Sequence, residues 1–374
     1  MEKISLDNKT ILVTGAAGFI GSNLVLRLFK EVNGATIIGI DNMNDYYDVR
    51  LKEYRLSVIS TEAERSLDKL GMTNGNAWKF VKGDIANRDT IDGIFAEYHP
   101  HIVVNLAAQA GVRYSITNPD AYIQSNMIGF YNILEACRHN PVEHLVYASS
   151  SSVYGGNKKV PFSTDDRVDN PVSLYAATKK SNELFAHCYS KLYNIPTTGL
   201  RFFTVYGPAG RPDMAYFGFT NKLLKGETIQ IFNYGNCRRD FTYVDDIVEG
   251  VIRVMQGAPA SPESSPKGED SSPVLLGKGR GEAVPYAVYN IGGGQPENLL
   301  DFVQILQEEL VRAGVLPADF DFEAHKELVA MQPGDVPTTY ADATALERDF
   351  GFVPKITLRE GLRKFAEWYK EYYQ

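Results

Sequence analysis

Short apolar runs alternate with stretches of helical periodicity through the first half of the chain. The apolar runs occupy residues 10–15, 35–41, 78–84, 101–108, 143–150 and 197–203. Helical patterns separate them at residues 18–30, 88–98, 119–139 and 173–193. Because fully apolar strands that alternate with helices are typical of parallel sheets, the pattern predicts an α/β fold with helices on both faces of one sheet.

The second half of the chain is less regular. Its strand candidates lie at 229–232 and 287–291, and its helix candidates lie near 216–225, 243–256, 298–313 and 357–372. We predict a larger domain over residues 1–203 and a smaller C-terminal α/β domain over residues 204–374. Some later segments, about 239–256 and 287–291, are expected to return to the first domain.

One segment of the second half lacks the apolar residues that a core needs. Residues 257–273 read GAPASPESSPKGEDSSP, which is dominated by Pro, Ser and Gly. Such a composition predicts a mobile surface loop, which we place over residues 257–285.

Composition and charge narrow the classes of partner. The 374 residues are 44% hydrophobic and 22% charged, as in ordinary globular proteins, and the formal net charge is −8. A net acidic chain without a long Lys/Arg run is a poor candidate for binding nucleic acid or an anionic membrane. A small anionic ligand remains compatible with this charge, because a few placed arginines and helix N-termini suffice.

Cysteine and histidine usage predicts a reduced protein without a metal. Cys137, Cys188 and Cys237 lie far apart, which fits an intracellular chain without disulfides. The chain enters a strand almost at once and has no 18-residue apolar run, so we expect a soluble cytoplasmic protein. His99 and His101 allow a metal pair, but a loop that leads into a strand is the favoured interpretation.

A glycine-rich turn follows the first strand candidate. TILVTGAAGFIG, residues 10–21, carries Gly15, Gly18 and Gly21, with Phe19 and Ile20 between the last two, and leads into the helix expected from about residue 18. Free N–H groups and the helix dipole at such a turn favour a diphosphate, as in Rossmann-type dinucleotide sites. Tight packing of the helix on the sheet is the alternative explanation for the glycines.

Acidic residues at the ends of the next strands favour the diphosphate interpretation. Asp41 lies twenty residues after Gly21, where an acid can accept hydrogen bonds from the adenosine ribose, and Asn42 follows it. Since no Arg directly follows to hold a 2′-phosphate, the sequence favours NAD over NADP. Asp84 would either cap the adenine amine or serve only as a turn residue. Together these features predict a Rossmann-type doubly wound parallel sheet.

Tyr175 and Lys179 share one helix face in the segment SLYAATKK. A free tyrosine has a pKa of ~10, so bringing it to ~7 for use as a base needs about 4 kcal/mol of stabilisation of the phenolate. A nearby ammonium and the positive ring of an oxidised nicotinamide both act in that direction. The spacing alone also occurs by chance on many helices.

These motifs together resemble the extended short-chain dehydrogenase/reductase superfamily, in particular its nucleotide-sugar epimerase branch. The similarity covers nearly the whole chain. The segments at 41–56, 107–115, 201–214, 238–246 and 332–342 are most similar to UDP-glucuronate 4-epimerases, which interconvert UDP-glucuronate and UDP-galacturonate. The resemblance implies an NAD-binding first domain and a second domain that mainly binds the UDP-sugar.

The resemblance also implies roles for individual residues. Tyr175 would be the base, Lys179 its partner on the cofactor ribose, and Ser150, five positions before Gly155 of the VYG turn, the catalytic hydroxyl. The implied cofactor contacts are Gly15, Gly18, Phe19, Ile20, Gly21, Asp41, Asn42, Asp84, Ile85, Leu106, Ala107, Ala108, Gln109, Asn126, Ser149, Tyr175, Lys179 and Phe202. The implied substrate contacts are Arg113, Ser150, Ser151, Ser152, Tyr175, Thr204, Arg211, Arg239 and Asp335.

Within this set, the resemblance makes Arg211 the clamp for the uronate carboxylate. Two positions depart from the related pattern. Gln332 stands where related UDP-hexose epimerases often carry a second arginine, and Ala209 replaces a bulkier residue.

Several alternatives stay open. A 4,6-dehydratase would need an Asp-Glu pair where Ser151 and Ser152 stand. A UDP-glucuronate decarboxylase shares the substrate, whereas a UDP-glucose or UDP-N-acetylhexosamine 4-epimerase would act on a neutral sugar. A catalytically idle NAD-binding sensor is a further class, disfavoured by the intact Ser150, Tyr175 and Lys179. The helices at 119–139 and 173–193 are apolar over much of their circumference, so we expect a homodimer.

Overall fold

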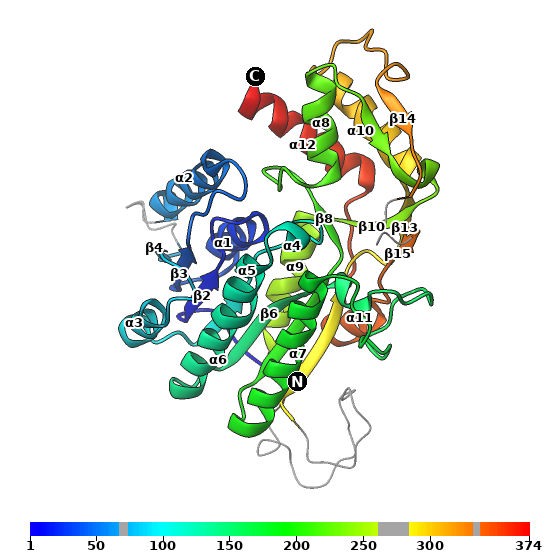
Figure 1. The fold of residues 1–374 in the computed structure, drawn as a ribbon. Helices are drawn as coiled ribbons and strands as arrows, with labels where there is room; N and C mark the ends of the chain where they lie inside the picture. Colours follow the sequence, from blue (N-terminus) through cyan, green and yellow to red (C-terminus); the bar gives the residue numbers. More distant parts are fainter. Residues whose placement is uncertain (67–73, 261–283, 332–336) are drawn as a thin grey trace.

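The centre of the molecule is a seven-stranded parallel sheet (Figure 1). The structure, a computed structural model, describes residues 1–66, 74–260, 284–331 and 337–374. The strands in sheet order are β12 (Tyr286–Ile291), β7 (Thr197–Phe202), β6 (His144–Ser150), β5 (Ile102–Asn105), β2 (Thr10–Thr14), β3 (Thr36–Asp41) and β4 (Ala77–Lys82). The order reverses between β2 and β5, which is where doubly wound sheets bind their ligands. The predicted Rossmann-type fold is confirmed.

Alternate residues of each strand serve two cores, one on each face of the sheet. Ile11 and Val13 of β2 pack on the face covered by α1 (Phe19–Glu31) and α9 (Val244–Met255). Leu12 packs on the opposite face, in a core that α3, α6 and α7 complete. These three helices are α3 (Arg88–Tyr98), α6 (Gly129–His139) and α7 (Leu174–Tyr193), and they lie on one side of the sheet in Figure 1. Because both faces of the sheet are buried, successive residues of strands such as β2 are apolar, as the sequence shows.

Two stretches differ from the pattern that the sequence predicts. The segment after β3, polar in sequence, contains a long helix, α2 (Val49–Ser66), whose buried side chains include Lys52 and Arg55. Because charged residues occupy part of the buried face of α2, its sequence does not show the hydrophobic periodicity that predicts a helix. The helix predicted over 119–139 is divided into α5 (Pro119–Tyr122), a π-helical turn η1 (Ile123–Ile128) and α6.

The four-stranded sheet formed around β10 lies beyond the carboxyl edge of the central sheet. There β10 (Arg238–Tyr243) pairs antiparallel with β13 (Pro296–Asn298) and parallel with both β15 (Thr338–Thr339) and β8 (Thr204–Tyr206). Buried Asp240 of β10 accepts hydrogen bonds from the backbone N–H groups of Gly293, Gly294 and Ala341, so one carboxylate joins three segments. Around this sheet lie α8 (Ala215–Leu224), α10 (Leu299–Arg312) and α12 (Leu358–Tyr373).

The remaining elements are short. They are β1 (Glu2–Lys3) with β11 (Gly257–Ala258), β9 (Ile229–Ile231) with β14 (Lys326–Leu328), α4 (Tyr114–Thr117), α11 (Thr344–Phe350), and the 3-10 turns η2 (Ser151–Tyr154) and η3 (Phe232–Gly235). β12 pairs with β7 in the central sheet, and α9 packs against α1. The division into domains at residue 203 stays a prediction, and most of the loop predicted over 257–285 lies outside the described residues. Among the described helices, none has the length and apolarity to cross a membrane.

Candidate active site

The glycine turn packs against the loop that follows β5. Gly15 has φ +70°, and a Cβ there would lie 2.9 Å from the backbone nitrogen of Ala107. A Cβ on Gly21 would overlap the carbonyl oxygen of Gly15. The N-cap residue of α1 is Gly18, which has no side chain to occupy the first N–H groups of the helix. The close packing of the turn therefore accounts for these glycines, while a diphosphate at the N-terminus of α1 stays a prediction.

The ends of β3 and β4 are joined by polar contacts. Asp41, buried at the end of β3, accepts a hydrogen bond from the N–H of Met43 and lies 3.5 Å from the ammonium of Lys52. The amide of Asn42 donates to Asp84 at 2.9 Å, and Asp84 also accepts from a backbone N–H two residues later. Asp84 is thus both a turn residue and a link to the loop after β3.

Asn126 connects the loop after β5 to the helix that carries Tyr175. Its carbonyl oxygen accepts from the N–H of Gln109 at 2.8 Å, and its amide donates to the carbonyl of Gln109 at 3.0 Å and to Thr178 at 3.1 Å. Asn126 lies in the π-helical turn η1, and such turns are frequent at functional sites. Leu106, Ala107 and Ala108 belong to the same loop, where the N–H of Ala107 donates to Thr14.

Ser150, Tyr175 and Lys179 come together where β6 ends and α7 begins. Ser150 is the last residue of β6, and its hydroxyl accepts hydrogen bonds from the N–H and the hydroxyl of Ser152. Ser173 caps α7, which places Tyr175 in the first turn, and the Ser150 hydroxyl hydrogen-bonds to its phenol. Lys179 is buried and donates to the carbonyl of Ala148 at 2.9 Å.

Burial and charge act in opposite directions on these groups. Burial raises the pKa of Tyr175 above its usual 10, while the hydrogen bond from Ser150 and the positive charge of Arg211 lower it, and Asp213 raises it. Burial also lowers the pKa of Lys179 to about 8. Arg211 is thus a cation that favours the phenolate of Tyr175 in this arrangement, and more positive charge would be needed to ionise the phenol at neutral pH.

The four consecutive serines have different surroundings. Ser149 is buried and donates to Glu183 at 2.7 Å, and this carboxylate forms a buried ion pair with Arg201 at 2.8 Å. Ser151 and Ser152 begin the 3-10 turn η2 and are half-buried. The Ser149 hydroxyl therefore joins a buried polar network, whereas the three that follow lie at the carboxyl edge of the sheet.

Arg211 forms a bidentate ion pair with Asp213. Nε donates to one carboxylate oxygen at 3.0 Å and Nη2 to the other at 2.5 Å, and the hydroxyl of Tyr46 also donates to Asp213. A series of tyrosine rings continues from Tyr46 through Tyr114 and Tyr122 to Tyr175, with centroid separations of 4.8, 6.2 and 5.9 Å. Our sequence reasoning did not single out Tyr46 or Asp213, although a carboxylate two residues after Arg211 is a visible signal.

The other predicted residues lie on several separate elements. Phe202 ends β7 and Thr204 begins β8, while Ile85 is buried against Gly129. Arg113 is exposed and lies over the ring of Phe232. The guanidinium of Arg239, on the small sheet, donates to the carbonyl of Pro337 at 3.0 Å. Asp335 and Gln332 lie outside the described residues.

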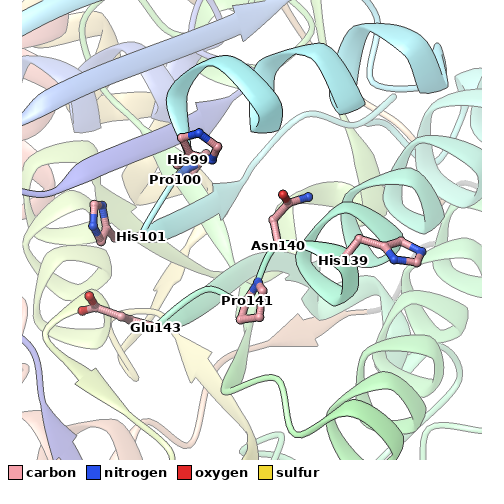
Figure 2. Close-up of a pocket in the computed structure, with 7 residues that line it drawn as sticks. All are labelled: His99, Pro100, His101, His139, Asn140, Pro141 and Glu143. Atoms are coloured by element: carbon pink, nitrogen blue, oxygen red, sulfur yellow. The ribbon is translucent and has the colours of Figure 1, made fainter.

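A surface pocket at the opposite edge of the central sheet has a different character. Figure 2 shows its lining residues, which are His99, Pro100, His101, His139, Asn140, Pro141 and Glu143. Nδ1 of His101 accepts a hydrogen bond from the N–H of Thr10, and His99 ends α3 in a left-handed conformation. Among residues 1–66, 74–260, 284–331 and 337–374, no three or more His, Cys, Asp or Glu side chains form a group suited to a metal ion.

Comparison with known proteins places this geometry in a family. The model of the NAD dependent epimerase/dehydratase family matches residues 11–265. Protein CapI from Staphylococcus aureus is 51% identical over 97% of this chain and 99% of its own length. A probable UDP-glucuronate 4-epimerase from Rhizobium meliloti (strain 1021) is 42% identical, with 97% of each chain covered.

Solved structures agree with the sequence relatives. A crystal structure of UDP-glucuronic acid 4-epimerase from Bacillus cereus, in complex with UDP-glucuronic acid and NAD, superposes with a TM-score of 0.77 at 30% identity. The match covers 97% of this chain and all of that one. The resemblance inferred from the motifs is thereby confirmed, and the chain belongs to the NAD dependent epimerase/dehydratase family.

Proposed function

We propose that this protein is an NAD-dependent UDP-glucuronate 4-epimerase, which interconverts UDP-glucuronate and UDP-galacturonate. The observation that carries the proposal is the pair of groups around the phenol of Tyr175. Ser150 hydrogen-bonds to it, and Arg211, a guanidinium suited to a carboxylate, lowers its pKa. The named Rhizobium and Bacillus relatives support the same substrate.

The residues of the glycine turn fit NAD. A Cβ at Gly15 or Gly21 would clash with the backbone of Ala107 or Gly15, so the turn needs glycine to close tightly before α1, whose N-terminus would hold the diphosphate. Asp41 would accept from the adenosine ribose, and Lys179 would contact the second ribose. NAD bound in this way would supply the acceptor and then the donor for the hydride of sugar C4.

In the proposed cycle Tyr175 accepts and returns the proton of the sugar 4-hydroxyl, and Ser150 hydrogen-bonds to the oxygen at C4. The phenolate takes the proton of the sugar 4-hydroxyl while C4 is oxidised, and Ser150 donates a hydrogen bond to the resulting ketone oxygen. After the 4-keto sugar turns within the site, Tyr175 returns the proton when C4 is reduced. The cycle is redox-neutral, and the product is the 4-epimer.

A uronate brings a side reaction that the site must suppress. Its 4-keto form is a β-keto acid, which loses CO₂ when the bond to the carboxylate aligns with the ketone. We propose that Arg211, helped by Thr204, Ser151 and Ser152, holds the carboxylate out of that alignment, because a bidentate guanidinium fixes orientation as well as charge. Arg113, Arg239 and Asp335 complete the proposed contacts to the UDP-sugar.

Incubation of the purified protein with UDP-glucuronate, without added NAD, tests the proposal. The expected product is UDP-galacturonate, resolved by anion-exchange chromatography from UDP-xylose, which a decarboxylase would release. A parallel incubation with UDP-glucose distinguishes a neutral-hexose epimerase. Formation of UDP-xylose alone, or turnover of UDP-glucose alone, would replace the proposed activity by one of those alternatives.

We further propose a cytoplasmic homodimer. Several apolar side chains of α6 and α7 are exposed although the other side of each helix packs on the sheet: Tyr131, Leu184, Phe185, Leu192 and Tyr193. A second copy of the same face would cover them. All three cysteines are free, which fits a reducing compartment. Light scattering on the parent and on Leu184→Asp is expected to give a dimer and a monomer, respectively.

A further inference from the structure

Arg55 of α2 is a buried cation, with 2% of its surface exposed, between two loops of the site. An arginine has five N–H donors, and hydrogen bonds use all five here. Nη1 donates to the carbonyl of Ala17 at 3.0 Å and to the hydroxyl of Tyr47 at 2.7 Å. Nε and Nη2 donate to the carbonyl of Ala209 at 2.9 and 2.7 Å, and Nη2 also donates to that of Gly210 at 3.0 Å.

The two loops that this guanidinium joins have different tasks. Ala17 lies in the glycine turn, between Gly15 and Gly18, where the cofactor diphosphate is proposed to bind. Ala209 and Gly210 directly precede Arg211, the proposed carboxylate clamp. One side chain therefore contacts the backbone of both.

Ala209 needs such a contact to keep its conformation. Its φ is +50°, in the left-handed region that costs a non-glycine residue about 1–2 kcal/mol. Its carbonyl receives two of the five hydrogen bonds from Arg55. A Cβ on Gly210 would overlap the hydroxyl of Tyr216, so the next residue also has little freedom. The direction in which Arg211 leaves the loop follows from these two residues.

The helix that carries Arg55 is itself held from two sides. Lys52, one turn earlier, pairs with Asp41 of the central sheet at 3.5 Å. Tyr54 packs against Tyr372 of α12 with ring centroids 4.7 Å apart, and its hydroxyl accepts from the indole of Trp368. These contacts hold α2 in place, and with it the guanidinium of Arg55 that bonds to both loops.

We propose that Arg55 is a positioning residue that couples the cofactor turn to the carboxylate-binding loop, so that the two are ordered together. This inference rests on the proposed function. Arg55 does not touch the reacting atoms. It holds the left-handed backbone at Ala209 and thereby sets where the guanidinium of Arg211 meets the uronate. Because coupling is reciprocal, an ordered cofactor turn also favours the ordered substrate loop.

The first test replaces Arg55 by lysine, which keeps the charge and loses the planar fork. We expect Arg55→Lys to raise KM for UDP-glucuronate by about tenfold and to increase the ratio of UDP-pentose to UDP-galacturonate. Arg50→Lys, the same change at an exposed position of α2, is the matched control and is expected to match the parent. A structural role alone would lower kcat through loss of folded enzyme and leave KM and the product ratio unchanged.

The second test asks whether the hydrogen bonds from Arg55 stabilise the strained left-handed backbone of Ala209. Glycine adopts the left-handed conformation without cost, so Arg55→Lys/Ala209→Gly is expected to recover several-fold of the loss in kcat/KM. Ala209→Gly alone is measured beside the double variant, so that its own effect can be subtracted. A double variant no better than Arg55→Lys would contradict the proposed strain.

Hydrogen–deuterium exchange gives a readout that does not depend on turnover. In Arg55→Lys the backbone amides at 16–18 and at 207 and 209–211 should both exchange faster, by about tenfold, while those of β12 match the parent. Parent-like exchange in these segments, or a parent-like KM and product ratio, would overturn the coupling. A parent enzyme that fails to form UDP-galacturonate refutes the proposed function instead, and the exchange experiment still decides the coupling.

Discussion

At the scale of single residues, the proposed mechanism depends on the phenol of Tyr175, whose surroundings raise its pKa. Burial raises the pKa of Tyr175, and Ser150 and Arg211 only partly offset this effect. If Tyr175 is the base, as proposed, its pKa depends on these neighbours, and removing either one should shift the pH dependence of activity.

Removal of the phenol oxygen tests the base directly. Tyr175→Phe is expected to reduce epimerisation by at least ~10³-fold with NAD still bound, and Ser150→Ala by on the order of 10²-fold, because one positioned donor is lost. Chromatographic rates and the NAD content of the purified variants measure both. Tyr189→Phe, the same change on the same helix, should match the parent. Near-normal turnover by Tyr175→Phe would exclude this residue as the base.

Arg211 and Asp213 should move the pH profile in opposite directions. Removal of the cation in Arg211→Gln destabilises the phenolate, so the pH at which activity reaches half its maximum should rise. Removal of the anion in Asp213→Asn should lower it. Rates of a single oxidation step across pH 6 to about 10 measure the shifts, with Arg50→Gln as control. Shifts of the same sign in both variants would contradict the assigned electrostatics.

Arg211→Gln should also change the products. The loss of a bidentate charged contact typically costs about 2–5 kcal/mol of binding, so affinity for UDP-glucuronate should fall sharply. The freed carboxylate should send more of the 4-keto intermediate to a UDP-pentose, measured as the ratio of pentose to epimer. Parent-like affinity and ratio would mean that the carboxylate is held elsewhere, with Arg113 and the Ser151–Ser152 pair as the next candidates.

At the scale of elements, the π-helical turn η1 is a joint between the loop after β5 and α7. Its Asn126 makes three hydrogen bonds to Gln109 and Thr178. Because these groups are buried, the loss of the amide leaves polar atoms without their partner.

Asn126→Ala is therefore expected to lower the free energy of unfolding by about 2–3 kcal/mol and to weaken the retention of NAD. Urea denaturation and the absorbance of released cofactor measure the two effects. Asn140→Ala is the control, since that amide donates to one carbonyl near the end of α6. Equal effects of the two substitutions would contradict the prediction that Asn126 of η1 joins the loop after β5 to α7.

The sequence predicts well those elements whose burial is apolar on every side. The strands at 36–41, 102–105 and 144–150 appear in the sequence as continuous apolar runs, because both faces of the sheet are covered. Helix α2 does not appear in this way, since its buried side includes Lys52 and Arg55. Their acceptors, Asp41 and Ala209, lie at sequence distances that no local pattern reports.

In the candidate site too, local motifs are visible in the sequence, whereas contacts between distant segments are not. Motifs located Gly15, Ser150, Tyr175 and Lys179, because each is spaced within one local segment. The ion pair of Arg211 with Asp213 and the contact to Tyr46 depend on how loops meet in space. Sequence reasoning therefore named candidate groups, whose roles stay proposals, and did not indicate the ion pair and the hydrogen bond around Arg211.

At the scale of the whole molecule, one buried histidine links stability to pH. His144 lies between β6, β7 and the end of α9, with Nε2 at 2.8 Å from the hydroxyl of Thr198 and Nδ1 at 3.4 Å from the carbonyl of Met255. Burial lowers its pKa from 6.5 to about 4. Between these two values the unfolded chain binds a proton that the folded chain does not, so stability falls as pH falls.

The contribution of His144 should be visible between pH 7 and about 4.5, where it amounts to about 2–3 kcal/mol of lost unfolding free energy. In His144→Gln this part of the pH dependence should disappear, although the variant starts from a lower stability. His139→Gln, at an exposed position, should keep the parental dependence. Urea titrations at both pH values measure the difference, and parallel curves for parent and His144→Gln would contradict the assignment.

The ion pair between Arg211 and Asp213 has a consequence for how the molecule recognises its ligand. The guanidinium already carries a carboxylate that belongs to the chain, so in the proposed complex an incoming uronate would have to take the place of Asp213 at Arg211 while Asp213 itself stays nearby on the chain. A neutral hexose has no anion to exchange and meets a pair that is already satisfied. A uronate would then be selected over a neutral hexose because its own carboxylate can take the place of Asp213 at the guanidinium of Arg211.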